Sequence, residues 1–180
     1  RRSSDLLSRY FDWAIAVADR IGELGFDAFF TTDDMAFKTA PYFSPQVFRE
    51  LILPHYRRLA EHVSLPWVIH SDGNIIPFLD DLLELGISGL HPLETGAVDI
   101  RAVKRRYGHD LCLLGNIDLN VLGAGTEAEV EREVRRVIGV LGPEGGYICT
   151  SGNSLAAYCR PENVRAMVRT VLTYGVYPLG

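Results

Sequence analysis

The sequence predicts an α/β protein built from five parallel strand and helix units, and three observations support this fold class. Short apolar runs alternate along the chain with longer segments whose apolar residues recur at helical spacing. The short runs lack alternating polarity, which is typical of parallel strands covered on both faces. No low-complexity stretch or linker separates the units, so residues 1–180 are expected to form a single domain. This pattern fits an open doubly wound sheet or part of a (β/α)8 barrel.

The elements are predicted as follows. A first helix over residues 5–24 presents Leu6, Tyr10, Phe11 and Ala14 to the core and ends at Gly25. A second helix opens at Ser44-Pro45 and contains Pro54, which lacks an amide donor and is expected to kink it. The five strands are expected at residues 28–31, 67–70, 89–91, 111–114 and 147–150.

The last two helices carry the clearest start signals. Thr126 and Glu129 form a capping box, and the apolar stripe of Val130, Val134, Val137, Ile138 and Leu141 follows it. Pro161 suits the first turn of the final helix, and Gly175 can end it in the left-handed conformation. This final helix is predicted to face the core with Val164, Met167, Val168, Val171 and Leu172.

Composition excludes several function classes. The chain has 23 acidic and 18 basic residues and a net charge of -5, so it has no basic surplus for nucleic acid. No apolar run approaches the ~20 residues that span a bilayer, so no membrane partner is expected. Three cysteines without a CxxC pair favour a reducing, cytoplasmic compartment. The chain begins with Arg1 rather than Met, which suggests a piece of a longer protein.

Polar side chains gather where the predicted strands end. In parallel α/β folds ligands bind at this carboxyl edge, so these exits are the natural candidates for a functional site. The five exits read Thr31-Thr32-Asp33-Asp34, His70-Ser71-Asp72-Gly73-Asn74, His91-Pro92-Leu93-Glu94, Gly115-Asn116-Ile117-Asp118 and Ser151-Gly152-Asn153-Ser154.

The pair His70 and Asp72 is the sharpest of these elements. An imidazole and a carboxylate two residues apart can hold a divalent metal such as zinc or act as an acid/base pair. Glu94 and Asp118 can complete either arrangement. The alternative is structural: Asp72 would cap the following helix and His70 would be a hydrogen-bonded core residue.

The remaining candidates carry the same ambiguity. In the pair Asp33 and Asp34 one carboxylate is expected to face the site while the other caps a helix or faces solvent. Asn116 and Asn153 can bind polar substrate groups, although asparagine after a strand is commonly a turn former. No glycine-rich phosphate loop is present, so dinucleotide binding is disfavoured.

Several segments together resemble the uroporphyrinogen decarboxylase superfamily. The resemblance covers about residues 20–177 in order, and includes Asp33-Asp34, Ser44-Pro45 and Pro54. Its carboxyl-terminal motifs are Gly115-Asn116-Ile117-Asp118 with Leu122, Ser151-Gly152-Asn153-Ser154, Pro161-Glu162-Asn163-Val164-Arg165-Ala166-Met167 and Tyr174-Gly175-Val176-Tyr177. Members are (β/α)8 barrels of about twice this length, so the resemblance implies the carboxyl-terminal part of a TIM barrel.

The superfamily has two branches that differ in chemistry. The true decarboxylases need no cofactor, and their last strand exit usually reads Gly-His-Gly where this chain has Gly152-Asn153-Ser154. The cobalamin-dependent methyltransferases hold zinc with a His-x-Cys pair and a later Cys. His70 matches that histidine, whereas Asp72 and Asn153 stand at the two cysteine positions, which implies a harder metal site.

The resemblance implies an enzyme whose favoured chemistry is metal-assisted methyl transfer from a corrinoid-linked or small methylated donor. Zinc would be held by His70 and Asp72, and the corrinoid would be a substrate or the group of a partner corrinoid protein. One alternative is uroporphyrinogen decarboxylation in porphyrin biosynthesis, with a tetrapyrrole substrate and no cofactor. The other is an inactive fragment or assembly module, whose exposed sheet edges predict a homo-oligomer. The expected catalytic residues are His70, Asp72 and Asp34, and the expected substrate-binding residues are Asp33, Glu94, Asn116, Asp118 and Asn153.

Overall fold

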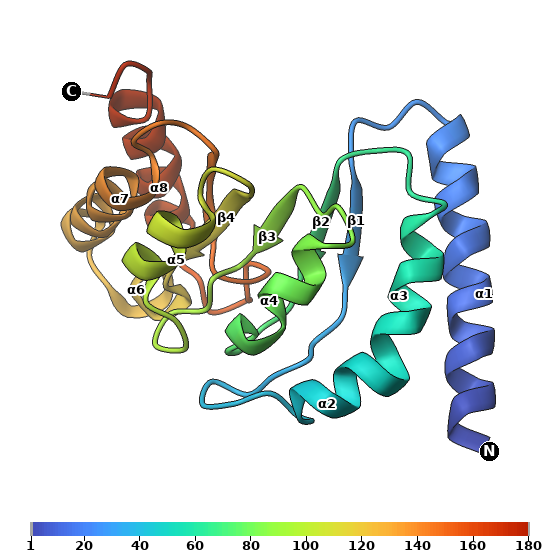
Figure 1. Cartoon of the computed structure of the whole chain (residues 1–180). Coiled ribbons are helices and arrows are strands. Elements are labelled where there is room, and N and C mark those ends of the chain that lie inside the picture. Colours follow the sequence, from blue (N-terminus) through green and yellow to red (C-terminus); the bar gives the residue numbers. More distant parts are fainter. Residues whose placement is uncertain (1, 180) are drawn as a thin grey trace. The chain divides into compact units, whose positions relative to one another are not determined.

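Strands and helices alternate along the chain in the computed structural model, which describes residues 2–179 and the side chains of residues 5–179 (Figure 1). The strands are β1 (Phe29–Thr32), β2 (Trp67–His70), β3 (Gly89–His91), β4 (Cys112–Ile117) and β5 (Tyr147–Ser151). The hydrogen-bonded order of the sheet is β1-β2-β3-β4-β5. The predicted α/β class with five strands is confirmed.

The helices fill the intervals between the strands. They are α1 (Arg2–Glu23), α2 (Pro45–Val47), the π-helical segment η1 (Phe48–Ile52), α3 (Leu53–Ala60), α4 (Ile76–Leu83), α5 (Ile100–Tyr107), α6 (Leu119–Ala124), α7 (Glu127–Leu141) and α8 (Pro161–Tyr174). The chain divides into two compact units, residues 1–89 and residues 90–180, and each unit is described by itself below.

The first unit is organised around a parallel pair of strands. Strand β1 pairs with β2 in a register that runs from Phe29 opposite Trp67 to Thr32 opposite His70. Because the strands are parallel and in register, their carboxyl ends meet at one edge. Trp67 is buried and donates a hydrogen bond from Nε1 to Thr31 Oγ1 at 3.0 Å, which ties the two strands together through side chains.

Helices α1 and α3 lie side by side in the first unit (Figure 1). The core face of α1 is narrower than the sequence predicts, because Phe11, Ala14 and Ala18 are buried while Leu6 and Tyr10 are exposed. Small Ala side chains at helical spacing allow the helix to approach α3 closely. The prediction that Leu6 and Tyr10 of this helix face the core is therefore wrong.

The predicted helix that contains Pro54 runs without a break over residues 45–60, and its middle part is π-helical. Ser44 Oγ accepts a hydrogen bond from the Val47 amide at 3.2 Å and starts α2, as predicted. The helix then becomes π-helical in η1, where the Leu53 amide donates to the Phe48 carbonyl. Helix α3 begins at Leu53 with Pro54 in its first turn. The π-helical turn therefore lies directly before Pro54, which has no amide to donate to the preceding turn.

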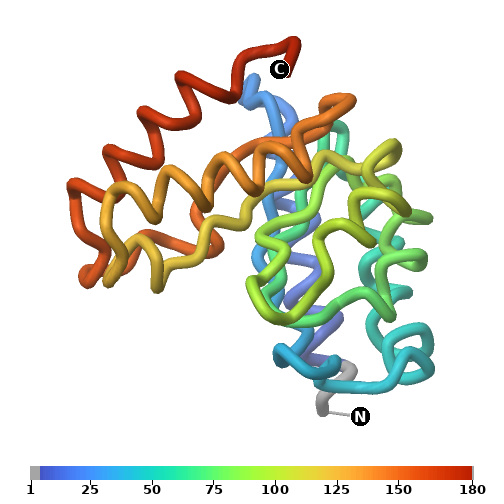
Figure 2. The backbone as a smooth tube through the Cα atoms, turned by 90° about the vertical axis from the view of Figure 1, so that its left-hand side faces the viewer, coloured from blue at the N-terminus to red at the C-terminus, as the bar shows by residue number. Residues whose placement is uncertain are grey.

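The second unit pairs β4 with β5, and α7 with α8. Strand β4 runs parallel to β5, with Leu113 opposite Tyr147 and Ile117 opposite Ser151. Helices α7 and α8 lie side by side (Figures 1 and 2). The predicted capping box is present, since Thr126 Oγ1 accepts from the Glu129 amide and Glu129 Oε2 accepts from the Thr126 amide at 2.8 Å. The predicted stripe of α7 is buried.

The buried face of α8 differs from the prediction. Asn163, Ala166 and Thr170 are buried, whereas Leu172 is 72% exposed. The reason is a polar anchor, because Asn163 Nδ2 donates to the carbonyl oxygens of Leu122 at 3.0 Å and Gly125 at 2.8 Å. These bonds satisfy carbonyls at the end of α6 and keep Asn163 on the buried face of α8, while Val164, Met167 and Val171 of the predicted stripe are half-buried. Gly175 ends α8 with φ -97°, so the predicted left-handed stop is also wrong.

None of the helices, among the residues that the structure describes, combines the length and apolar character needed to cross a bilayer.

Candidate functional site

Three predicted site residues come together where β1 and β2 end. His70 Nε2 lies 3.7 Å from Asp34 Oδ1 and 3.7 Å from Asp72 Oδ1. One ligand atom of each residue lies within 4.8 Å of the others. Asp34 is exposed, whereas His70 and Asp72 are half-buried. We call these three residues the carboxylate–histidine cluster.

Backbone and side-chain hydrogen bonds hold the two strand exits together. The Asp72 amide donates to Asp34 Oδ1 at 3.0 Å, and the Asp33 amide donates to the His70 carbonyl at 2.9 Å. The hydroxyl of buried Ser71 accepts from the Met35 amide at 3.0 Å and donates to the Asp72 carbonyl. Sequence reasoning did not single out Ser71, although its place between His70 and Asp72 puts it on the opposite face of an extended chain.

The cluster has a donor set that fits a divalent cation. It offers one imidazole nitrogen and two carboxylate oxygens, which are ligands for zinc and for harder divalent ions. The three cysteines of the chain stand at positions 112, 149 and 159, outside the first unit. At the start of α4 the Ile76 amide donates to Asn74 Oδ1 at 3.3 Å, so Asn74 stands at the position where the structural alternative expected Asp72 to cap the helix.

Asp33 turns away from the cluster, towards two tyrosines. Tyr10 donates from its hydroxyl to Asp33 Oδ1 at 3.3 Å, and the Asp33 carboxylate lies near enough to the buried Tyr56 side chain to raise its pKa. Consecutive residues of an extended chain point to opposite sides, so Asp34 joins His70 while Asp33 turns towards α1 and α3. The structure thereby decides which of the two carboxylates belongs to the cluster.

Burial raises the pKa of Tyr56 well above its ordinary value, and the Asp33 carboxylate raises it further. Because the pKa of Tyr56 is higher in the folded than in the unfolded protein, its neutral hydroxyl stabilises the fold. This contribution to the free energy of unfolding is fully present below the unfolded pKa of about 10 and is lost as the pH rises above that value. Above pH about 10, the free energy of unfolding should fall less steeply with pH in the Tyr56→Phe variant than in the wild type. The difference between the two slopes is expected to be up to about 1.4 kcal/mol per pH unit. Urea unfolding at several alkaline pH values checks this, and an unchanged pH slope would contradict it.

Gly73 allows the loop after β1 to contact the exit of β2. Its φ is +82°, and a Cβ at this position would fall 2.6 Å from the Phe37 carbonyl oxygen and would also clash with the Ala36 backbone. The Gly73→Ala variant is therefore expected to be destabilised by both backbone strain and displacement of this loop, by more than about 2 kcal/mol.

Gly86→Ala is a matched control for that substitution. Gly86 has the same φ of +82°, but a Cβ added there would meet no atom within 4 Å. This variant should lose only the strain cost of about 1 kcal/mol. Chemical denaturation of both variants measures the difference, and equal losses would show that the close approach at Gly73 contributes nothing.

The predicted site residues of the second unit lie in or after strands, and each makes a hydrogen bond to a nearby backbone group. Asp118 Oδ1 accepts from the Asn120 amide at 2.8 Å and caps α6. Asn116 is buried and donates from Nδ2 to the Leu93 carbonyl at 2.7 Å. Asn153 Oδ1 accepts from the Ser154 amide at 2.7 Å, as in a turn. Glu94 is half-buried after β3, and its carbonyl accepts from the Ala97 amide. Their predicted contacts with substrate remain predictions.

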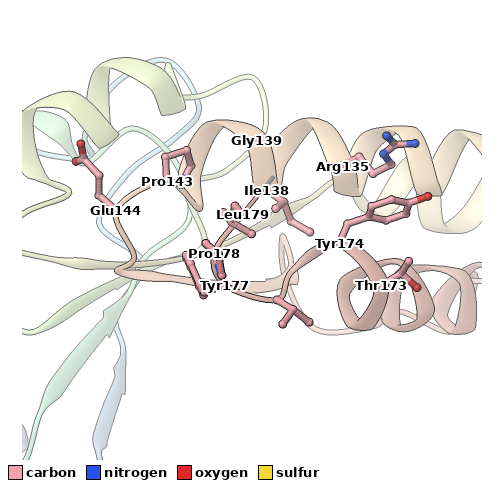
Figure 3. A pocket seen from close by; sticks show the side chains of 11 residues that line it. Arg135, Ile138, Gly139, Pro143, Glu144, Thr173, Tyr174, Tyr177, Pro178 and Leu179 are labelled. Carbon is pink, nitrogen blue, oxygen red and sulfur yellow. The ribbon is translucent and has the colours of Figure 1, made fainter.

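A cavity of about 850 Å³ in the second unit lies elsewhere (Figure 3). It is lined by residues of α7, of α8 and of the tail that follows α8, and none of the predicted site residues lines it. The Arg135 guanidinium stacks over the Tyr174 ring at 4.3 Å, and Tyr177 donates to the Gly142 carbonyl at 2.6 Å. The first contact joins α7 to α8, and the second joins the tail to the residue that follows α7.

Comparison with known proteins identifies the family. The family model for uroporphyrinogen decarboxylase matches residues 1–174. A uroporphyrinogen decarboxylase of Shewanella loihica is 27% identical over 138 residues, which cover 71% of this chain and 37% of that protein. A methylated-thiol–coenzyme M methyltransferase of Methanosarcina mazei is 25% identical over 162 residues, covering 88% and 41%.

A solved structure shares the fold. A methyltransferase from Methanosarcina mazei superposes with a TM-score of 0.75 at 23% sequence identity and covers 92% of this chain. The match includes 48% of that protein, so the chain spans less than half the length of the relatives it matches. Because the family model covers nearly the whole sequence, the chain belongs to the uroporphyrinogen decarboxylase family.

Proposed function

We propose that the chain contributes a divalent-cation site to an enzyme that transfers a methyl group from a corrinoid-linked or small methylated donor. The observation that carries this proposal is the carboxylate–histidine cluster, whose three ligand atoms lie within 4.8 Å of one another. The relative that acts on methylated thiols supports the choice of methyl transfer within the family. Zinc is the proposed cation.

The residues of the cluster have distinct parts in this proposal. His70, Asp34 and Asp72 would hold the cation, which when bound supplies a Lewis acid that lowers the pKa of an acceptor thiol. Half-burial of His70 and Asp72 limits competition from water, whereas exposed Asp34 leaves the cluster open to solvent on one side. Ser71 holds the His70–Asp72 segment against the loop that carries Asp34.

Methyl transfer from methylcobalamin to 2-mercaptoethanesulfonate tests the proposal. The methyl group moves to the thiolate sulfur, and the electron pair of the carbon–cobalt bond stays on cobalt as cob(I)alamin. We expect zinc-dependent loss of methylcobalamin absorbance with the wild-type protein, and a rate at least about 100-fold lower in His70→Ala.

His62→Ala is the control for that experiment. His62 belongs to the same unit and pairs with Asp19 at 2.9 Å, away from the two strand exits. It should retain the wild-type rate. A wild-type rate in His70→Ala, or methyl transfer that is independent of zinc, would contradict the proposal.

Uroporphyrinogen decarboxylation is the second candidate, and similarity to the Shewanella enzyme favours it. His70, with a carboxylate on either side at 3.7 Å, would donate the proton that replaces the lost carboxylate on carbon. This reaction needs no cofactor. Coproporphyrinogen formation from uroporphyrinogen in the presence of a metal chelator would favour this candidate over methyl transfer.

The partners of the enzyme are also proposals. A small methylated molecule, a tetrapyrrole or a corrinoid carried by a partner protein would be the substrate. Assembly into a homo-oligomer is proposed from the expected exposed strand edges. A cytoplasmic location is proposed from the cysteines, all three of which are free among the described residues.

A further inference from the structure

The hydrogen-bond ladder between β1 and β2 ends in a side-chain bridge. Its last backbone bond runs from the Asp33 amide to the His70 carbonyl at 2.9 Å. Bonds in a parallel ladder are evenly spaced, so the register of β1 and β2 places the Met35 amide opposite the Asp72 carbonyl next. The Met35 amide instead donates to Ser71 Oγ at 3.0 Å, and the Ser71 hydroxyl donates to the Asp72 carbonyl at 3.0 Å. A hydroxyl thereby takes the place of one backbone bond.

A second side chain takes the place of the neighbouring ladder bond. Continuation of the same register would pair the Asp72 amide with the Asp33 carbonyl. The Asp72 amide donates to Asp34 Oδ1 at 3.0 Å instead. A bridging side chain spans a wider gap than a direct bond between backbone groups. The two strand exits therefore stand apart just where the Asp34 carboxylate lies beside His70.

Burial makes the Ser71 hydroxyl hard to replace. Ser71 is 2% exposed, so water has little access to its two hydrogen bonds. A hydroxyl both donates and accepts, and it therefore satisfies the Met35 amide and the Asp72 carbonyl at once. A methyl group in its place would leave both backbone groups without this partner, which costs free energy at a buried position.

The loop that follows β1 has no slack with which to close the gap. The Asn74 amide donates to the Phe37 carbonyl at 2.9 Å, so the two segments are joined again beyond the bridge. The Gly73 backbone already lies against this loop, because a Cβ there would clash with the Ala36 backbone. Loss of the bridge is therefore expected to loosen the part of the loop that carries Asp34 rather than to close the ladder.

We infer that Ser71 is the positioning residue that sets where the Asp34 carboxylate lies relative to His70. Its hydroxyl fixes the amide of the residue after Asp34, and Asp34 Oδ1 lies 3.7 Å from His70 Nε2 in that arrangement. Ser71 itself supplies none of the three ligand atoms of the carboxylate–histidine cluster. Its effect on a cation rests on the proposed function, whereas its effect on Asp34 depends only on the fold.

A double-mutant cycle on zinc affinity tests this inference. Ser71→Ala and Asp34→Asn are each expected to weaken Zn²⁺ binding about 10-fold, as is usual when a group that orients a ligand is lost. The double variant should bind no more than about twofold more weakly than either single variant, because both substitutions remove the same ligand. Competition titration with a chromogenic chelator measures all four affinities. Losses that multiply would overturn the inference.

Asp72→Asn is the matched comparison within the cluster. Its carboxylate lies 3.7 Å from His70 Nε2 on the same strand exit, so its place does not depend on the loop after β1. This substitution should weaken zinc binding by the same factor with and without Ser71→Ala. A loss that disappears in the Ser71→Ala protein would show that the whole cluster has collapsed, and would contradict a role through Asp34.

Thr170→Ala controls for the loss of a buried hydroxyl in general. Thr170 is 4% exposed in the second unit, and its Oγ1 donates to the Ala166 carbonyl at 2.8 Å. This variant also loses a buried hydrogen bond, but it should keep zinc affinity within about twofold of wild type. A loss as large as that of Ser71→Ala would assign the effect to stability alone and overturn the inference.

Amide hydrogen exchange of the metal-free protein, followed by NMR, reports the position of Asp34 without a cation. In Ser71→Ala the Met35 amide loses its acceptor and the Asp72 amide loses a fixed Asp34, so both should exchange at least about 10-fold faster. The Asp33 amide, which bonds to a carbonyl of the ladder, should keep its wild-type rate. Wild-type exchange of the Met35 and Asp72 amides in Ser71→Ala would overturn the inference.

The two measurements separate this inference from the proposed function. If the wild-type protein binds no zinc but exchange at Met35 and Asp72 depends on Ser71, the cation site fails and the positioning role stands. If His70→Ala abolishes zinc binding while the losses from Ser71→Ala and Asp34→Asn multiply, the cation site stands and the positioning role fails.

Discussion

Replacing His70 with alanine is expected to lower the affinity of the protein for Zn²⁺ by more than about 100-fold. Loss of a hydrogen-bond partner one shell away from a metal already costs about 10–100-fold, and His70 is the nitrogen donor of the cluster itself. Its Nε2 lies 3.7 Å from an oxygen of both Asp34 and Asp72, so its removal leaves two carboxylates without the donor between them. Competition titration with a chromogenic chelator measures the affinity.

The neighbouring carboxylate provides the control for this prediction. Asp33→Asn removes a charge one residue from Asp34, but the Asp33 carboxylate accepts a hydrogen bond from Tyr10 and turns away from the cluster. Its zinc affinity should stay within about threefold of wild type, because a solvent-screened charge at this distance changes binding little. Equal losses in both variants would mean that general charge, rather than the cluster, attracts the cation.

Trp67→Ala is expected to lower the free energy of unfolding by about 3–5 kcal/mol. Trp67 is 2% exposed and packs against the rings of Phe29 and Tyr56, with centroids 6.3 Å and 6.2 Å away. The substitution leaves a cavity and also deprives Thr31 of the hydrogen bond from the indole. Urea denaturation followed by circular dichroism gives the change.

Trp13→Ala is the matched comparison for that variant. Trp13 is 60% exposed on α1, so its removal should change the free energy of unfolding by less than about 0.5 kcal/mol. Both variants lose one indole, and only the buried one should matter. A similar loss in the two variants would contradict the place of Trp67 in the core between β1, β2 and α3.

The strands could be predicted from the sequence because short apolar runs alternate with segments of helical spacing. The predicted end of β4 at residue 114 was too early, since the structure extends the strand to Ile117. Gly115 and Asn116 are poor strand formers by propensity, and they belong to β4 because they pair with Cys149 and Thr150 of β5. The face of α8 could not be predicted, because it depends on the carbonyls that Asn163 meets at the end of α6.

The candidate site was only partly visible in the sequence. The spacing of His70 and Asp72 at the end of an apolar run indicated a pair of ligands, and the structure adds Asp34 to them. The choice between Asp33 and Asp34 depends on Tyr10 and Tyr56, which are 23 residues before and after Asp33 in the sequence.

The central claim is that Asp34, His70 and Asp72 together bind one divalent cation. X-ray absorption spectroscopy of the zinc-loaded protein tests it most directly, because zinc–sulfur bonds of about 2.3 Å differ from zinc–nitrogen and zinc–oxygen bonds of about 2.0–2.2 Å. We predict one equivalent of zinc with only nitrogen and oxygen neighbours, including one imidazole that disappears in His70→Ala. A sulfur neighbour, or an imidazole signal that survives in His70→Ala, would contradict the claim.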